Sequence, residues 1–484
     1  MRTAFRLYPG IALLLILTSG LFAQAPEPGS SEGPYIVEEI NYHIDGITRK
    51  GALMKELGDL RTGISFQSEN ELQNFIAEQR QLLLNLRQLK ESSRIEYSIG
   101  EKTGGHYPVR LDIYTEDSWN IIVLPIPEYD SNNGFSLTLK YRDLNLFGTL
   151  ERFALDVAWE RQDGDTNNRL ELEFILPFQW LEHQWHWDTA AYWEYTAGEH
   201  DLESYTSVGV DLPIKDYTPT LSFRESYNYE STDIDKNWIT SRLELAEDFS
   251  TGLFLPGFGQ FIYTPGIYTE IDYKFDKPIS REKEGPGIGY GQLLTAGQVD
   301  WIGNFRKGVD LRIENTNTWN LQHLYWNRDA RASLSGFYPL PFRILFWPFM
   351  VSGRVAGFAE FDGEFEEEAA SYIRGIRDLK MGEAVEYGGF INTDLTMRAF
   401  TIPDFVEGQG SVFFDAGWVK EQDTAFDPDK HFKMGLGLEA IGFPFFARGY
   451  YIRASLGIDL KAVIDQGDWG GENYELFIVL GHHY

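Results

Sequence analysis

Residues that could support catalysis are few in this sequence, and their spacing is unsuitable. His183 and His186 flank an aromatic segment, but the interval between them places the two rings on opposite faces of a strand, so they are unlikely to share a metal ion. Gly287, Gly289 and Gly291 have glycine spacing that resembles a phosphate-binding loop, yet no strand–turn–helix pattern surrounds them. The sequence contains no His-Glu-x-x-His motif and no cysteine nucleophile. We therefore expect no enzymatic activity, no bound metal and no cofactor.

One arginine and one carboxylate have neighbours that suit a specific charge pair. Arg374 is followed directly by Gly375, and Asp415 lies about forty residues later on a predicted strand. A guanidinium binds a carboxylate through two parallel, charge-assisted hydrogen bonds. Glycine next to the arginine allows a positive φ or a close backbone approach. Such a pair needs a scaffold that brings the two segments together.

The composition excludes several classes of scaffold. The chain has 484 residues, of which 15% are aromatic, and no cysteine; 42 Lys and Arg against 73 Asp and Glu give a net charge of −31. A nucleic-acid binder needs a basic face to contact phosphates, so we expect no nucleic-acid partner. Disordered chains are poor in aromatic residues, and a disulfide framework or a zinc–thiolate site requires cysteine.

The N-terminal segment indicates export. Arg2 and Arg6 precede the apolar run 10–17, and small residues follow at Ala23 and Ala25. This pattern predicts a secretory signal peptide over residues 1–23. The alternative is an uncleaved anchor, but the run is well short of the roughly 20 apolar residues that a spanning helix needs. Residues 24–34 are rich in Pro, Gly and Ser and are predicted to be a linker.

Residues 35–116 predict a small α+β module. A strand over 36–44 is followed by helical patterns over 50–60 and 69–89, then by alternating strands over 94–99 and 109–114. Strands and helices mixed in this order, in a segment of this length, fit one compact module.

From residue 117 onward the pattern changes to strict alternation. Segments such as 135–142, 153–159 and 170–176 alternate apolar, often aromatic, residues with polar or charged ones. Alternation over segments of about ten residues, separated by turns, is typical of a transmembrane β-barrel, in which closure satisfies every backbone group. The alternative is a large secreted sandwich or propeller, which rarely needs so many aromatic residues. Residues 117–484 number 484 − 116 = 368, and at about 20–25 residues per strand we expect about sixteen strands.

The layout and several local motifs resemble the BamA/TamA superfamily of outer-membrane assembly and translocation proteins. Those proteins carry periplasmic POTRA modules followed by a sixteen-stranded barrel. Residues 35–116 look like one POTRA module, with Gly46 after its first strand and Gly63 between its helices. Segments 116–119 and 122–127 are similar to the junction between module and barrel, and 143–148 is similar to an early hairpin motif.

The most specific part of the resemblance concerns the charge pair. In the family, an arginine-glycine motif at the tip of a long extracellular loop folds into the lumen and docks on a strand that carries Phe-x-Asp-x-Gly. The resemblance therefore implies that Arg374 docks on Asp415, with Glu439 as a secondary partner. The residues that carry this expectation are Ile373, Arg374, Gly375 and Ile376 in the loop and Phe413, Asp415 and Gly417 on the strand.

The resemblance also implies a function and a location. It predicts an outer-membrane barrel, with its module in the periplasm, that inserts or translocates other proteins by pairing a client strand with an exposed sheet edge. The expected partners are the outer-membrane bilayer, unfolded outer-membrane or secreted client proteins, and periplasmic or lipoprotein partners. The final residue, Tyr484, is similar to the aromatic insertion signal of such barrels. Only one module is present, and a passive pore with a vestigial module, or a surface antigen, is the alternative.

The seam between the first and last barrel strands is the expected entry point for a client. The first strand is predicted near 120–127 and contains Pro125 and Pro127, which donate no ladder hydrogen bond. The last strand, near 474–484, contains Gly481. Both sides therefore have reasons to pair incompletely, which would let the seam open laterally. The alternative is that the prolines merely end a short strand at the rim.

Overall fold

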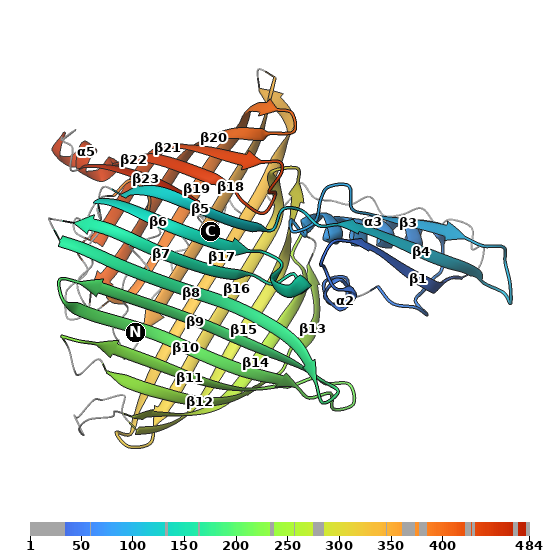
Figure 1. The fold of residues 1–484 in the computed structure, drawn as a ribbon, viewed down its shortest axis with the longest axis horizontal. Coiled ribbons are helices and arrows are strands. Elements are labelled where there is room, and N and C mark those ends of the chain that lie inside the picture. Colours follow the sequence, from blue (N-terminus) through green and yellow to red (C-terminus); the bar gives the residue numbers. More distant parts are fainter. Residues whose placement is uncertain are drawn as a thin grey trace, which may run out of the picture.

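The computed structural model shows a large closed barrel with a small unit at one end (Figure 1). It describes residues 34–58, 60–130, 134–162, 165–232, 237–255, 257–273, 285–344, 346–360, 373–376, 385–421, 427, 431–467 and 473–480. The predicted signal peptide, the linker up to residue 33, Gly481 and Tyr484 lie outside the described residues. No helix in these ranges is long and apolar enough to cross a membrane.

Residues 35–116 form the small α+β unit. Its elements are β1 (Tyr35–Asp45), α2 (Lys50–Glu56), β2 (Ser65–Phe66), α3 (Glu69–Asn85), β3 (Arg94–Ile99) and β4 (Tyr107–Glu116). The sheet order is β2-β1-β4-β3, with β1 parallel to β4. The predicted order of helices and longer strands is the order observed; the two-residue β2 is too short to produce an alternating pattern.

Helix α3 shows how the local sequence builds this unit. The Ser68 hydroxyl accepts a hydrogen bond from the Glu71 backbone N–H, and the Glu71 carboxylate accepts one from the Gln67 backbone N–H, which resembles a capping box. Leu72, Ile76 and Leu83 recur at helical spacing and are buried in the core with residues of β4. The same core contains Leu150, which belongs to a barrel connection.

The barrel is an antiparallel sheet closed on itself, in which each strand pairs with its neighbours in chain order. One short helix of the barrel, α5 (Leu460–Gln466), lies at the end away from the α+β unit (Figure 1). The strands are β5 (Ile121–Asp130), β6 (Gly134–Asp143), β7 (Phe153–Gln162), β8 (Asp165–Trp180), β9 (His183–Thr196), β10 (Glu199–Asp211), β11 (Thr220–Glu230), β12 (Trp238–Ala246), β13 (Phe249–Leu255), β14 (Gly259–Tyr273), β15 (Gly285–Ile302), β16 (Phe305–Asn320), β17 (Tyr325–Ile344), β18 (Trp347–Glu360), β19 (Val385–Ile402), β20 (Val406–Glu421), β21 (Phe432–Pro444), β22 (Ile452–Asp459) and β23 (Tyr474–Leu480).

The number of strands differs from the sequence-based expectation of about sixteen. Nineteen strands are described in the barrel. Two of them, β12 and β13, follow each other along β14 in nearly one register, from Ala246 opposite Gly266 to Phe249 opposite Tyr263. They occupy one place, which leaves 19 − 1 = 18 positions around the ring. Several connections are only two residues long, as at 303–304, so the average of 368/18, or about 20 residues for each position, is at the lower end of the assumed range.

The alternating pattern sorts side chains between the two faces of the barrel wall, as predicted. Leu137 and Leu139 on β6 are exposed on the outside, whereas Thr138 and Lys140, which alternate with them, are buried. Lys140 lies 3.4 Å from Asp156 of β7, so the charged residues meet on the inner face. An apolar exterior around a polar interior is the arrangement that a bilayer requires.

Candidate functional site

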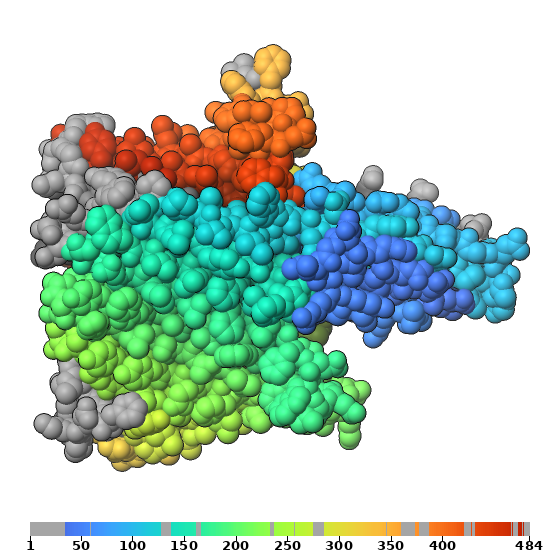
Figure 2. Space-filling model, in the orientation of Figure 1, coloured from blue at the N-terminus to red at the C-terminus, as the bar shows by residue number. Residues whose placement is uncertain are grey.

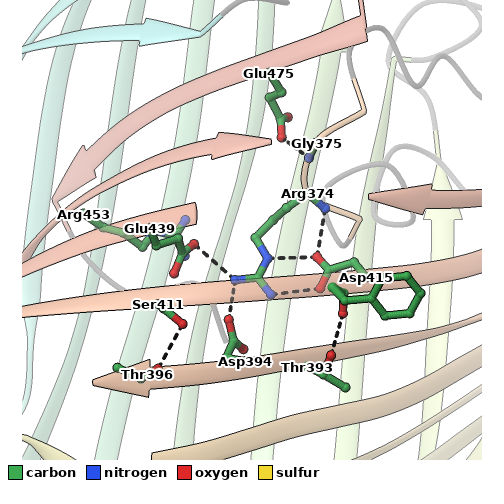
Figure 3. Close-up of polar contacts among 11 residues, drawn as sticks. Arg374, Gly375, Thr393, Asp394, Thr396, Ser411, Asp415, Glu439, Arg453 and Glu475 are labelled. Carbon is green, nitrogen blue, oxygen red and sulfur yellow. Dashed lines mark hydrogen bonds and ion pairs between the residues drawn. The ribbon is translucent and has the colours of Figure 1, made fainter. Parts of the chain in front are cut away.

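The candidate site is centred on Arg374, which lies inside the barrel. Residues 373–376, here called the lock segment, belong to the connection between β18 and β19. Arg374 is only 5% exposed. Its Nε and Nη2 each donate to the Asp415 carboxylate at 2.8 Å, and its backbone N–H donates to the same carboxylate at 2.9 Å (Figure 3). The structure thus brings together the two residues that the sequence pattern paired.

Two further carboxylates bind the same guanidinium. Arg374 Nη1 donates to Asp394 Oδ1 at 2.8 Å and to Glu439 Oε1 at 3.1 Å (Figure 3). Glu439 was expected as a secondary partner, but Asp394 was not. The guanidinium carbon also lies 4.1 Å from the centre of the Phe413 ring, a cation–π contact. Three neighbouring strands, β19, β20 and β21, therefore each contribute one carboxylate to the same arginine, Arg374.

The polar network extends to the last two strands. Arg453 of β22 lies 3.6 Å from the Glu439 carboxylate, and the Gly375 backbone N–H donates to Glu475 of β23 at 2.5 Å. The lock segment is thereby connected to a strand that forms the seam. Sequence reasoning missed Asp394, Arg453 and Glu475. For Asp394 a signal existed, since Asn392, Asp394 and Thr396 alternate on the buried face of β19.

Glycines provide the space into which the lock segment fits. Gly375 has φ +89°, a conformation that other residues rarely adopt. A Cβ atom on Gly417 would lie 2.7 Å from Ile373 Cδ1, one on Gly435 would lie 1.7 Å from the Arg374 carbonyl oxygen, and one on Gly457 would lie 2.4 Å from Gly375 Cα. Only Gly417 was predicted from the sequence; β21 and β22 contribute the other two.

Apolar contacts complete the docking. Ile373 and Ile376 are both buried and form a cluster with Phe390 of β19. Because the charged network and this cluster both involve the lock segment, releasing the segment would expose both. Next to Arg374 lies a cavity of about 70 Å³, which is also lined by Asp394, Glu439 and Arg453. The arrangement can hold an inward-folded loop; among the described residues we find no group of three His, Asp or Glu side chains that could hold a metal ion.

The seam is weakly paired in the described part of the chain. Strands β5 and β23 share one register pair, Asp130 opposite Phe477. By contrast, β5 and β6 share ten pairs, and β22 and β23 share seven. Pro125 and Pro127 lie in the middle of β5, opposite Leu139 and Leu137 of β6. The alternative that the prolines end the strand at the rim is therefore wrong.

Comparisons with known proteins identify the fold. No protein-family model and no curated protein sequence matches this chain. Among solved structures, CdiB from Acinetobacter baumannii aligns over 92% of this chain and 74% of its own, with a TM-score of 0.51 and 14% identity. BamA from Haemophilus ducreyi lacking POTRA domains 1–3 aligns over 92% of this chain and 84% of its own, with a TM-score of 0.40 and 13% identity. CdiB from Escherichia coli aligns over 95% of this chain and 93% of its own, with a TM-score of 0.40 and 11% identity. At 14% identity this likeness concerns the fold alone: the chain has a barrel fold like that of CdiB from Acinetobacter baumannii, which agrees with the barrel predicted from the sequence.

Proposed function

We propose that this protein is an outer-membrane barrel that assists the assembly, insertion or translocation of other proteins by opening laterally between β5 and β23. The observation that carries the proposal is the single register pair at this seam, against ten and seven pairs at the flanking junctions. Among the described residues, separating β5 from β23 breaks fewer register pairs than separating any other two paired barrel strands; the next smallest number is four, between β13 and β14. A client strand can then pair with either free edge with little demand on its sequence.

The remaining parts of the chain have roles that fit this proposal. The α+β unit acts as a POTRA module in the periplasm, where it receives clients before they reach the barrel. The lipid bilayer surrounds the apolar exterior, and the lock segment, through Glu475, holds the strand at the seam in place. No step of this function needs a catalytic residue or a cofactor.

A disulfide across the seam tests the proposal. The register places Asp130 opposite Phe477, so we would combine Asp130→Cys with Phe477→Cys in a chain that has no native cysteine. The matched control is Leu456→Cys with Leu476→Cys, a register pair between β22 and β23. Both crosslinks join neighbouring strands, but only the first closes the seam.

The readout is the quantitative outer-membrane proteome of cells depleted of the native protein and complemented with each variant. We expect the oxidised seam crosslink to reduce the levels of other barrel proteins, reduction to restore them, and the control crosslink to have no effect. If the seam-locked protein supports normal assembly, lateral opening is not the function, and a passive pore or a surface antigen becomes the better explanation.

A further inference from the structure

The hairpin between β15 and β16 extends beyond both of its neighbours. β14 pairs with β15 only as far as Thr295, and β17 pairs with β16 only from Gly308 onward. Within the hairpin, however, pairing continues to Ile302 opposite Phe305. Residues 296–307, here called the tip, therefore form a two-stranded extension beyond the last register pairs of the hairpin with β14 and β17.

A pair of glycines bends the tip away from the wall. Gly297 has φ +112° and Gly308 has φ +129°, values that favour glycine. A Cβ atom on Gly297 would lie 2.1 Å from the Val309 carbonyl oxygen, and one on Gly308 would lie 1.9 Å from the Gln298 carbonyl oxygen. Both strands of the hairpin therefore bend at the same level, and a side chain at either glycine would oppose the bend.

The bent tip crosses the inside of the barrel mouth. In the ring order, β17, β18 and β19 separate this hairpin from β20. Nevertheless, the Asn304 carbonyl oxygen accepts a hydrogen bond from Gln409 of β20 at 3.0 Å, and the Trp301 ring lies 6.5 Å from the Phe443 ring of β21. Gln409 has the same parity along β20 as the buried Asp415, so it faces the lumen. The tip therefore lies across the opening.

The α+β unit holds the tip in this position through Arg87, which follows α3. Arg87 Nη2 donates to Asn304 Oδ1 at 2.9 Å, and the guanidinium carbon lies 4.2 Å from the centre of the Trp301 ring. Its Nε donates to the carbonyl oxygen of Arg448, in the connection between β21 and β22. Burial, and secondly the charge of Arg448, lower the pKa of Arg87 to about 10, so the guanidinium remains protonated at neutral pH. One buried cation thus joins the unit, the tip and a barrel connection.

Side chains of α3 also form hydrogen bonds with backbone groups of the tip. Asn85 Oδ1 accepts from the Trp301 backbone N–H at 2.9 Å, and Gln81 donates to the Trp301 carbonyl oxygen at 3.1 Å. Asn85 also donates to the Asp300 carboxylate at 2.9 Å. The helix therefore provides hydrogen-bond partners for backbone groups at a strand edge that could otherwise pair with another strand.

The unit is anchored to the barrel at a second place as well. The Asp117 carboxylate, just before β5, accepts hydrogen bonds from the backbone N–H groups of Ile47 and Thr48, and Leu150 from the β6–β7 connection lies in the core of the unit. Figure 2 shows that the surface of the unit is continuous with that end of the barrel. Because the β6–β7 connection and the tip come from distant positions in the ring, the unit spans the opening between them.

We propose that the tip is a plug that closes the lumen at the end facing the α+β unit, and that Arg87 latches this plug, so that displacement of the unit opens the barrel. This plug is separate from the lock segment, which joins β18 to β19 at the opposite end of the barrel. The two close the lumen in series. The proposal does not depend on the lateral opening of the seam.

Conductance in planar bilayers tests the plug. One variant replaces residues 299–308 by Asn-Gly, which leaves Gln298 and Val309, a register pair, on either side of a two-residue turn. A second variant is Arg87→Ala. Its matched control is Arg80→Ala on α3, because the Arg80 guanidinium donates to the Ile95 carbonyl oxygen within the unit and not to the tip. Each is measured alone and together with Arg374→Ala, since current requires both closures to open.

We expect the tip deletion and Arg87→Ala, each combined with Arg374→Ala, to raise the potassium chloride conductance severalfold above that of Arg374→Ala alone. Arg80→Ala combined with Arg374→Ala should add nothing. If the tip deletion combined with Arg374→Ala conducts no more than Arg374→Ala alone, the tip is not a plug. The deletion keeps the proposal testable even if Arg87→Ala fails to fold, because β15 retains all of its pairs with β14 and β16 loses only the Gly308–Phe337 pair with β17.

A labelling experiment tests the Arg87 latch while the lock segment stays docked at the opposite end of the barrel. Ser352 of β18 is buried and lines the cavity between the tip and the lock segment. In nanodiscs, Ser352→Cys should react slowly with a membrane-impermeant maleimide, faster when combined with Arg87→Ala or the tip deletion, and at the original rate with Arg80→Ala. An unchanged rate in the tip deletion would overturn the proposal.

Discussion

Removing the Arg374 side chain should release the lock segment. The guanidinium donates four hydrogen bonds to the carboxylates of Asp394, Asp415 and Glu439. Arg374→Ala removes the cation that these three buried acids share, although Arg453 remains 3.6 Å from Glu439. Removing one partner of a buried ion pair costs about 3–5 kcal/mol. At about 1.4 kcal/mol per factor of ten, the docking equilibrium should fall by roughly two to four orders of magnitude.

Labelling of a cysteine in the lock segment measures that equilibrium directly. Ile376 is buried when the segment is docked, and the chain has no native cysteine. When docking is faster than labelling, the rate at which Ile376→Cys reacts with a maleimide is proportional to the undocked fraction. The quantity to compare is the ratio of the rates with and without Arg374→Ala, so any effect of the cysteine itself cancels.

Two companion variants sharpen the comparison. Arg374→Lys keeps the charge but cannot bind a carboxylate through two parallel bonds, so its labelling rate should lie between those of the wild type and Arg374→Ala. Arg152→Ala removes an exposed ion pair with Glu173, which is worth about 0–1 kcal/mol, and should leave the rate nearly unchanged. If Arg374→Ala accelerates labelling no more than Arg152→Ala does, the buried network does not hold the loop.

Three other outcomes follow from the same contacts. Gly435→Ala should undock the lock segment, because its Cβ would lie 1.7 Å from a loop carbonyl oxygen, whereas Gly442→Ala on the same strand has nothing closer than 3.9 Å and should be neutral in the labelling assay. Asp117→Ala leaves backbone N–H groups without their acceptor, at about 1–3 kcal/mol, and should make the α+β unit more sensitive to limited proteolysis; unchanged digestion would contradict this role. Cysteine at Glu366 should label with an impermeant reagent on whole cells and cysteine at Glu78 should not, and the reverse pattern would refute the proposed orientation.

The sequence by itself determined the secondary structure of many segments and which of their faces is apolar. Alternation along β6 and β7 separates the apolar exterior from a polar interior, because side chains in any strand point to opposite faces. The helical spacing of Leu72, Ile76 and Leu83 likewise identified the buried face of α3. Arg374 and Asp415 could be paired in advance because their motifs resemble the docking loop and strand of a known family, and the bidentate geometry of a guanidinium and a carboxylate agrees with that pairing.

Only the tertiary structure decided which distant segments meet. Alternation places Asp394 on the inner face of β19, but nothing in the sequence near Asp394 or Glu475 indicates which segment either would bind. Gly435 and Gly457 likewise resemble other strand glycines in sequence, and only the structure shows that the lock segment lies against them. The same holds for the single register pair at the seam and for the contact of Arg87 with the tip. Main-chain hydrogen bonds are alike in every register, so the number of strands around the ring and the neighbours of each strand depend on closure of the whole barrel and on side chains far apart in the sequence.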